Sequence, residues 1–420
     1  GKNLYKAGKT NNVKMVEDII PPITTVANGL CTSDPAPTLK AIGTNPREAT
    51  SAVIRTGLRR VKAPSIIASS RALPLACKSR MKEIITTPFK TATPDRAIKP
   101  TPAEIDRGIS RSIKAAISQA EKNAGVSIKR VHVGIGSIGL EETYSHGEII
   151  PSRADSEVTP SDLDKVIQDS EERIMDHIPN RRILHSIPLR YTIDGSEVLG
   201  RPLGLKGTKL EIDSLFITTY EQHVNDLINT IEGIGIYVDD VIASPLAASF
   251  VMLSKVQKRA GCVLVNIGAE TTSMVVFEDS TPISLKIFPM GSNDVTNDIA
   301  LGLRIPLEDA EKIKRGAMTS ATYSKKKLDE IVQERLRTIF GLIDSQLKKI
   351  KRDGLLPAGV ILTGGGATVN GTVEVAKQTL ELPARIATLD IGKSTRIKDA
   401  SWAVAYGLCM WGASSVEETS

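Results

Sequence analysis

Three stretches of the chain repeat apolar side chains at the spacing of an α-helix. The first opens with Thr101 and Glu104, which form a capping pair, and its apolar stripe of isoleucines and alanines runs from Ile105 to Ala120 before Gly125 ends the helix. A second capped helix opens at Thr159. The third covers residues 328–350, roughly six turns with one apolar face. Each of these helices has a face that must pack on other elements.

Short apolar and β-branched runs between the helices predict strands, and Gly195 and Gly207 mark turns between some of them. Further helical patterns cover residues 221–232, the alanine-rich stretch after Pro245 and the segment from about Ser292. This alternation of strands and helices favours an α/β fold with an inserted subdomain. The expected strands are 131–135, a polar strand up to Ile150, 182–189, 191–193, 210–218, 236–241 and 283–288.

Two apolar strands end in turns that contain glycine, and these turns carry the candidate chemistry. Residues 261–277 read as a strand, a turn with Gly268, Thr271 and Thr272, and a second strand. Residues 359–367 read as a strand that ends in three consecutive glycines before a helical segment. Glycine permits close backbone approach, and backbone N–H groups and hydroxyls donate hydrogen bonds to phosphate. Together the two turns suit a nucleotide clamped between two lobes, whereas one alone would be weak support.

The net charge of +6 conceals an uneven distribution. Residues 1–100 carry 17 Lys and Arg against 6 Asp and Glu, whereas the remainder carries 37 against 42. We interpret this basic, proline-rich segment as poorly ordered and solvated, not as a nucleic-acid or membrane contact. The four cysteines and five histidines lack metal-ligand spacing, which indicates reduced cysteines in a cytosolic protein. No run reaches the ~20 apolar residues of a transmembrane helix, and the start does not look like a signal peptide.

Several motifs together match a known family. The hairpin around Gly268 looks like the second phosphate loop of the actin and sugar-kinase superfamily, and the glycines after Thr363 look like its adenosine loop. Residues 310–314 look like the helix that reaches the ribose and base. The insertion is the specific part, and over residues 100–412 the chain resembles FtsA, an actin-like family of bacterial cell-division proteins. The segments that follow the FtsA pattern are 147–164, 183–188, 191–195, 202–207, 289–292 and 296–300.

This resemblance implies an actin-like, two-lobed ATPase-type α/β fold with an FtsA-type inserted subdomain, and ATP with Mg²⁺ between the lobes. It implies an adaptor and not an enzyme, with at most weak ATPase activity. The partners would be the FtsZ C-terminal tail, further copies of the chain, downstream division proteins at the inserted subdomain, and the inner membrane at the division septum. The implied nucleotide-binding residues are Asn266, Gly268, Ala269, Thr271, Thr272, Glu311, Lys314, Gly364, Gly365 and Gly366, with Asn266 indirectly serving the metal.

The resemblance also divides the chain into parts. Residues 1–100 would be an atypical basic, Pro/Thr-rich segment, that is, a poorly ordered or degraded start of the first lobe. The other expected boundaries are 101–138 with 217–258 for the first lobe (1A), 139–216 for the inserted subdomain (1C), 259–290 with 356–412 for the second lobe (2A), 291–355 for the small subdomain (2B) and 413–420 for the tail.

Two positions depart from the family's pattern. Asn266 stands where the family has an Asp that positions the metal through water, so the metal affinity should fall. Ser244 stands where actin-like ATPases often place a Gln or Glu that orients the attacking water. Both departures favour nucleotide binding with little or no hydrolysis. Glu270 is a candidate to supply a carboxylate to the metal instead.

The first phosphate loop of the family has no clear counterpart. The nearest candidate is residues 41–44, which have Ala41 where the family has an Asp. A second possibility is a reading frame shifted upstream of about Lys99, because charge, proline content and periodicity all change there. A genuine segment would leave the first lobe without edge strands and would weaken ATP binding.

The C-terminal end departs from the family as well. Residues 413–420 are short and acidic, whereas FtsA proteins usually end in an amphipathic membrane helix. We therefore expect either a fragment or a chain that reaches the membrane indirectly, through a partner. Trp402, Met410 and Trp411 are expected on the core face of the last helix.

The resemblance places the FtsZ tail on the small subdomain. Because that tail is acidic and apolar in most relatives, a basic groove should receive it. Two other classes stay open: a PilM-like actin-fold scaffold of a type IV pilus or secretion machine, and a sugar or acetate kinase. The kinase would need a catalytic carboxylate near an acceptor pocket, for which we find no convincing candidate. The nearby positive charges are Lys325, Lys326, Lys327, Arg335 and Arg337.

Overall fold

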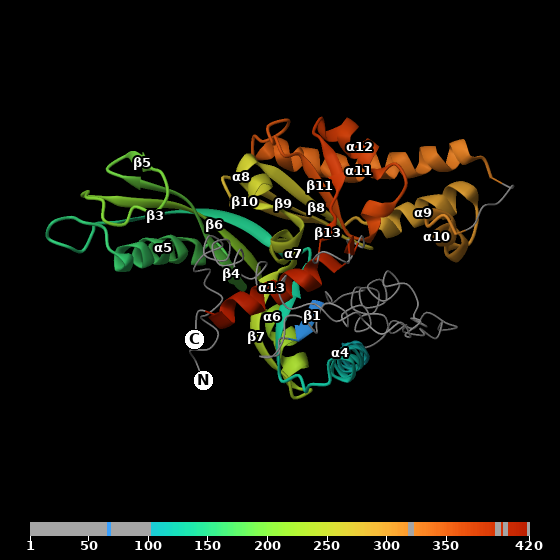
Figure 1. Cartoon of the computed structure of the whole chain (residues 1–420), viewed down its shortest axis with the longest axis horizontal. Coiled ribbons are helices and arrows are strands. Elements are labelled where there is room, and N and C mark those ends of the chain that lie inside the picture. The colour runs from blue at the N-terminus through green and yellow to red at the C-terminus, as the bar shows by residue number, and fades with distance from the viewer. Residues whose placement is uncertain (1–64, 69–101, 318–322, 391–395, 398–401, 418–420) are drawn as a thin grey trace, which may run out of the picture.

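Four sheets organise the chain, and the computed structural model describes residues 65–68, 102–317, 323–390, 396–397 and 402–417. Figure 1 shows a lower lobe, an upper lobe and a subdomain that projects to the left of both. Among the described helices, none has the length and apolar character needed to cross a membrane.

The first lobe is built on a three-stranded sheet. β1 (Ser65–Ala68) pairs antiparallel with β2 (Arg130–Ile135), and β2 pairs parallel with β7 (Tyr237–Ala243). The helix predicted to end at Gly125 is α4 (Pro102–Ala124), and this glycine has a φ of +68°. The other helices around this sheet are α6 (Glu221–Glu232), α7 (Ser244–Met252) and α13 (Ala403–Glu417), and α8 (Lys255–Ala260) leads into the second lobe.

β1 corrects one expectation from the sequence. Residues 1–100 show no lasting strand pattern, yet residues 65–68 form an edge strand on β2. Four residues are too few for a periodic pattern to be recognised, and pairing with a neighbouring strand stabilises them in the fold. The candidate phosphate loop at residues 41–44 lies outside the described residues, as does Thr101.

The projecting subdomain is a four-stranded antiparallel sheet with α5 (Pro160–Met175) packed on it. This helix begins with the predicted capping box, in which Thr159 and Asp162 exchange hydrogen bonds. The strands expected at 182–189 and 191–193 are a single strand, because bulges and not a turn interrupt it. In sheet order the strands are β3 (Glu141–Ile149), β6 (Leu210–Tyr220), β4 (Arg181–Ile193) and β5 (Ser196–Val198).

The second lobe has a five-stranded mixed sheet. In sheet order its strands are β10 (Thr281–Phe288), β9 (Thr272–Glu278), β8 (Cys262–Ile267), β11 (Val360–Thr363) and β12 (Ala384–Ile386). Its helices and remaining pieces are α9 (Ser292–Leu303), α10 (Leu307–Lys314), α11 (Lys325–Lys349), the 3₁₀ turn η2 (Gly365–Thr368), α12 (Thr372–Leu380), β13 (Leu389–Asp390) and β14 (Arg396–Ile397).

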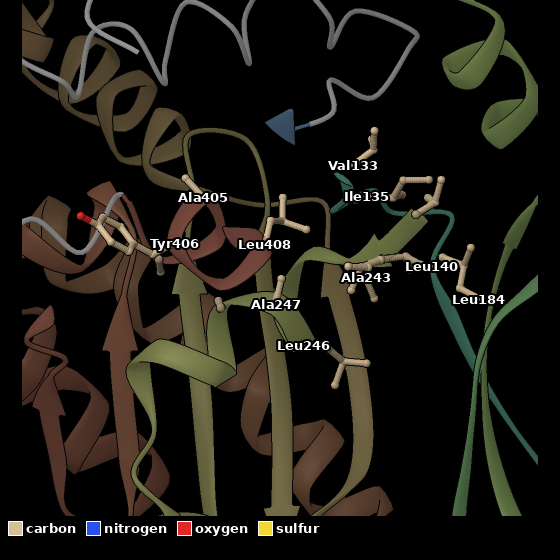
Figure 2. Packing of buried hydrophobic residues seen from close by; sticks show 14 of the residues in the cluster. Val133, Ile135, Leu140, Leu184, Ala243, Leu246, Ala247, Ala405, Tyr406 and Leu408 are labelled. Atoms are coloured by element: carbon tan, nitrogen blue, oxygen red, sulfur yellow. The ribbon is translucent and has the colours of Figure 1, made fainter. Parts of the chain in front are cut away.

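The last helix belongs to the core. Trp402 and Leu408 are 3% and 1% exposed, and Trp411 stacks on Phe250 of α7 with ring centroids 5.5 Å apart. Figure 2 shows the side chains of α13 lying against those of α7 and the strands of the first lobe. The prediction that these tryptophans pack inward is confirmed, and burial of such large apolar surfaces stabilises the junction of the lobes.

Candidate functional site

The carboxyl ends of β8 and β11 meet in the middle of the second-lobe sheet. The two strands pair in parallel, with Asn266 opposite Thr363. Gly364 has a φ of +85°, and a Cβ added to it would lie 2.3 Å from the Oδ1 atom of Asn266. A Cβ on Gly366 would lie 2.3 Å from Ile267. The two glycine-bearing turns therefore touch, and packing requires glycine at both positions.

Gly365 lies between these two residues but differs from them. It is exposed, and among the described residues no atom comes within 4 Å of the position of an added Cβ. Packing within the chain therefore does not require glycine at position 365. Its predicted role rests on the close approach of a ligand.

The turn after β8 is held by the start of α9. The Gly268 amide donates to the Thr271 carbonyl oxygen at 2.8 Å, which closes the turn. The carbonyl oxygens of Gly268 and Ala269 accept from the amides of Ser292 and Asn293 at 2.9 and 2.7 Å. The first amides of α9 are thus used inside the protein. The turn, and not this helix end, offers backbone groups to a ligand.

The two threonines of the turn have different surroundings. Thr272 is fully buried and donates its hydroxyl to the Met290 carbonyl oxygen at 2.9 Å. Thr271 is only half-buried. Since the Thr272 hydroxyl already has an acceptor in the core, Thr271 is the better placed of the two to contact a phosphate. Glu270 is also half-buried in this turn.

Glu311 and Lys314 on α10 form a network with α9. The Lys314 Nζ atom lies 2.7 Å from the Glu311 carboxylate and donates to the Thr296 hydroxyl and the Ser292 carbonyl oxygen at 2.7 and 3.0 Å. The Thr296 hydroxyl donates to Glu311 at 2.6 Å. Arg315 donates to the other carboxylate oxygen at 2.8 Å. The network therefore lies against the first turns of α9, whose first amides bond to the turn around Gly268.

Electrostatics stabilise this network in its charged form. Burial by itself raises the pKa of Glu311, but the charge and hydrogen bond of Lys314, with bonds from Thr296 and Arg315, outweigh burial and lower that pKa to about 2. The i,i+3 spacing of Glu311 and Lys314 was a sequence signal for their pairing. Thr296 and Arg315 were missed as their partners. Thr296 begins a segment that fits the family pattern, but nothing in its sequence position predicted a contact with Glu311 on α10.

Ser244 lies where β7 ends, against the last residues of β2. A Cβ on Gly134 would lie 2.9 Å from the Ser244 hydroxyl oxygen, and a Cβ on Gly136 would lie 3.2 Å from it. The Ser244 side chain is thus packed on two glycines and is 8% exposed. A short hydroxyl in this position reaches little solvent.

The basic residues expected to receive an acidic peptide are not equivalent. Arg335 makes a two-pronged ion pair with Asp298 of α9, at 2.6 and 2.9 Å, which joins the two helices inside the small subdomain. Arg337 is 49% exposed and contacts Glu334 at 3.4 Å on its own helix. Arg335 therefore stabilises the small subdomain, whereas Arg337 is the more accessible of the two arginines. The three lysines at 325–327 are exposed.

The two lobes, the inserted subdomain and the paired glycine turns define a protein of actin-like fold, as predicted. One solved structure, a PilM–PilN type IV pilus biogenesis complex, superposes with a TM-score of 0.55 at 15% identity, covering 83% of this chain and 95% of that one. At that identity the likeness shows the fold alone.

Sequence comparison identifies the family. The family model of the cell division protein FtsA matches residues 263–407, and that of the SHS2 domain inserted in FtsA matches residues 140–218. The FtsA of Pseudomonas aeruginosa is 30% identical over 72% of this chain and 77% of its own length. That of Bacillus subtilis is 26% identical over 68% and 69%. The chain belongs to the FtsA family of cell-division proteins, and the predicted resemblance is confirmed.

Proposed function

We propose that this chain is a division adaptor that binds ATP at the carboxyl ends of β8 and β11 and binds the C-terminal tail of FtsZ on its small subdomain. It self-associates, contacts downstream division proteins through the inserted subdomain, and links the division ring to the cytoplasmic face of the inner membrane. The observation that carries this proposal is the pair of touching glycine turns, with the Glu311 network against the helix that follows.

Nucleotide binding follows from the chemistry of these turns. Gly268 closes the turn, so that the amides of Ala269 and Thr271 and the Thr271 hydroxyl would meet the phosphates. Gly364 and Gly366 hold the second turn against β8, and Gly365 leaves room for the adenosine. Glu311 and Lys314 reach the ribose and base side of the cleft. A nucleotide there would lie against two turns that already contact each other through Asn266 and Gly364.

A magnesium ion bound with the nucleotide would have few protein ligands here. Asn266 supplies a neutral amide oxygen at the end of β8, and Mg²⁺ prefers charged oxygen ligands. Phosphate oxygens and water would therefore dominate its coordination, with Glu270 as a further candidate ligand. Ser244 is packed on glycines and orients water poorly, so we expect at most slow hydrolysis.

The start of α11 supports the proposed site for the tail. Lys325, Lys326 and Lys327 crowd the first turn of this helix, and the turn contains no acidic residue. Positive side chains there add to the positive end of the helix dipole. An acidic peptide bound at this end would relieve the repulsion, and Arg337 lies three turns further on an exposed face.

A titration of the whole chain with a peptide of the FtsZ C-terminal tail tests the proposal, with and without Mg-ATP. We expect saturable micromolar binding and a separate saturable signal from a fluorescent ATP analogue. A folded protein, shown by circular dichroism and a cooperative melt, that binds neither ligand would overturn the proposal. Peptide binding without ATP binding would support the adaptor role and contradict the proposed nucleotide binding.

A further inference from the structure

The inserted subdomain meets the second lobe along β10. This strand is the last in its sheet, and it contacts β3, β4 and β6 of the inserted subdomain. Figure 1 shows β6 running from the projecting subdomain toward the edge where β10 lies. The contact lies apart from the glycine turns at the carboxyl ends of β8 and β11.

One carboxylate is the centre of this contact. Glu142, near the start of β3, accepts hydrogen bonds at one oxygen from the Ser284 hydroxyl at 2.7 Å and from the Leu285 amide at 2.8 Å. Its other oxygen accepts from the side-chain amide of Gln346 at 2.7 Å. Ser284 and Gln346 are 0% and 6% exposed. Three donors of the second lobe thus converge on one side chain of the inserted subdomain.

Tyr144 adds a fourth hydrogen bond, two residues further along the same face of β3. Its hydroxyl donates to the Ile283 carbonyl oxygen at 2.9 Å. Leu285 N–H and Ile283 C=O are outward-facing groups of an edge strand, which would otherwise be open to pairing with another chain. Glu142 and Tyr144 cap them.

The contact also reaches the small subdomain. Gln346 lies in the last turn of α11, a single helix of 25 residues that spans about 37 Å. The middle of that helix is tied to α9 through Arg335 and Asp298. A movement of α11 along its axis would therefore displace one of the three donors to Glu142.

Apolar packing and hydrogen bonds contribute differently to the contact between β10 and the inserted subdomain. Leu285 and Ile287 of β10 share a core cluster with Leu184 and Leu215 of the inserted subdomain. Apolar contacts hold surfaces together without fixing an angle, whereas hydrogen bonds to a charged group require a geometry. Losing that geometry leaves buried donors without an acceptor, so the contact favours discrete positions over gradual drift.

We propose that Glu142 and Tyr144 form a latch that sets the angle of the inserted subdomain on the second lobe. Release of the latch lets that subdomain rotate about its apolar base while the two lobes keep their separation. Through Gln346 the latch couples the position of α11 to the angle of the inserted subdomain, by a route that bypasses the nucleotide cleft.

Paired spin labels on the full-length chain test this proposal. Genetically encoded label sites at Ser196 and Gln378, both exposed, report the distance from the inserted subdomain to the second lobe. A second pair at Asn229 and Gln378 reports the distance between the lobes. In Glu142→Gln we expect the ratio of released to latched molecules to rise about tenfold in the first pair, with no change in the second.

Two further variants make the experiment decisive. Glu148→Gln is the matched control, since Glu148 lies on the same strand but bonds to Lys209 and Arg173 within its own subdomain. Ser284→Ala removes a donor from the second-lobe side of the latch and should shift the same distance. This variant keeps the test valid even if Glu142→Gln unfolds the inserted subdomain. A single unchanged distance in both Glu142→Gln and Ser284→Ala, or an equal shift in Glu148→Gln, would overturn the latch.

Discussion

The two sides of the candidate nucleotide site are built from different materials. On the sheet side, Gly364 and Gly366 touch Asn266 and Ile267 so closely that a single added carbon would collide with the strand end. On the helix side, charged and hydroxyl side chains of α9 and α10 bond to one another. One side is defined by the absence of side chains and the other by their pairing.

This difference determines how each side tolerates change. A backbone clash cannot be relieved by a rotamer, so substitution on the sheet side costs strain whatever the new residue is. A charged network loses only the bonds of the altered group, and the remaining members keep some of their own. We therefore expect the largest effects on the sheet side.

Gly364→Ala should have the largest effect. The substitution places a Cβ 2.3 Å from Asn266 Oδ1 and 2.5 Å from the Ile267 carbonyl oxygen, at a φ of +85°. We expect the free energy of unfolding to fall by about 3 kcal/mol and binding of a fluorescent ATP analogue to be lost. Denaturant titration and fluorescence anisotropy measure the two effects.

Gly365→Ala is the matched control for this prediction. It adds the same methyl group one residue later, where the space for a Cβ is open. We expect a stability within about 0.5 kcal/mol of the unaltered chain, because exposed substitutions away from such features are usually mild. Equal stability loss in both alanine variants would show that the clash at Gly364 is not the cause.

The two strands and glycine turns of the sheet side could be predicted from the sequence, because runs of glycine after apolar strands indicate tight turns and close backbone approach. The structure adds the parallel pairing of β8 with β11, which brings the two turns together. The helix side could be predicted only by residue type. Thr296, one of the partners of Glu311, lies on a helix 15 residues earlier, and the angle between two helices decides which side chains meet.

Glu311→Gln tests the helix side and should have the second largest effect. Lys314 would keep its bonds to Thr296 and the Ser292 carbonyl oxygen but would lose its counter-charge in a nearly buried position. We expect a loss of about 2 kcal/mol in the free energy of unfolding at pH 7. Urea denaturation of both proteins provides the comparison.

The pH dependence of that loss has a definite sign. The pKa of Glu311 is lower in the folded chain, at about 2, than the ordinary 4.5, so its contribution is present above pH 4.5 and is lost as the pH falls toward 2. The difference between the Glu311→Gln variant and the unaltered chain should therefore shrink between pH 5 and pH 3. A difference that stays constant over this range would contradict the assigned network.

Asn266→Asp would add a charged side chain to the sheet side of the site, whereas the helix side already has charges. A carboxylate at the end of β8 should strengthen the magnesium dependence of ATP binding about fivefold, because Mg²⁺ prefers charged oxygen ligands. The ratio of ATP dissociation constants with and without Mg²⁺ measures this effect. Asn293→Asp, in the first turn of α9, adds the same charge outside β8 and should leave the ratio nearly unchanged. A shift of the same size in both variants would attribute the effect to general electrostatics.

The smallest expected effect concerns Arg337 of α11, and Arg335 on the same helix provides the contrast. Arg337→Glu should weaken binding of the FtsZ tail peptide about threefold and reduce its salt dependence, with stability unchanged, because this side chain is half exposed. Arg335→Glu would instead set a carboxylate against Asp298 and lower stability by about 2 kcal/mol, since it replaces a two-pronged ion pair with a repulsion. Peptide titrations at two salt concentrations, with melts of both variants, separate the outcomes. If Arg337→Glu binds the peptide like the unaltered chain, Arg337 lies outside the site, and the lysines at the start of α11 are then the positive charges that remain to be tested.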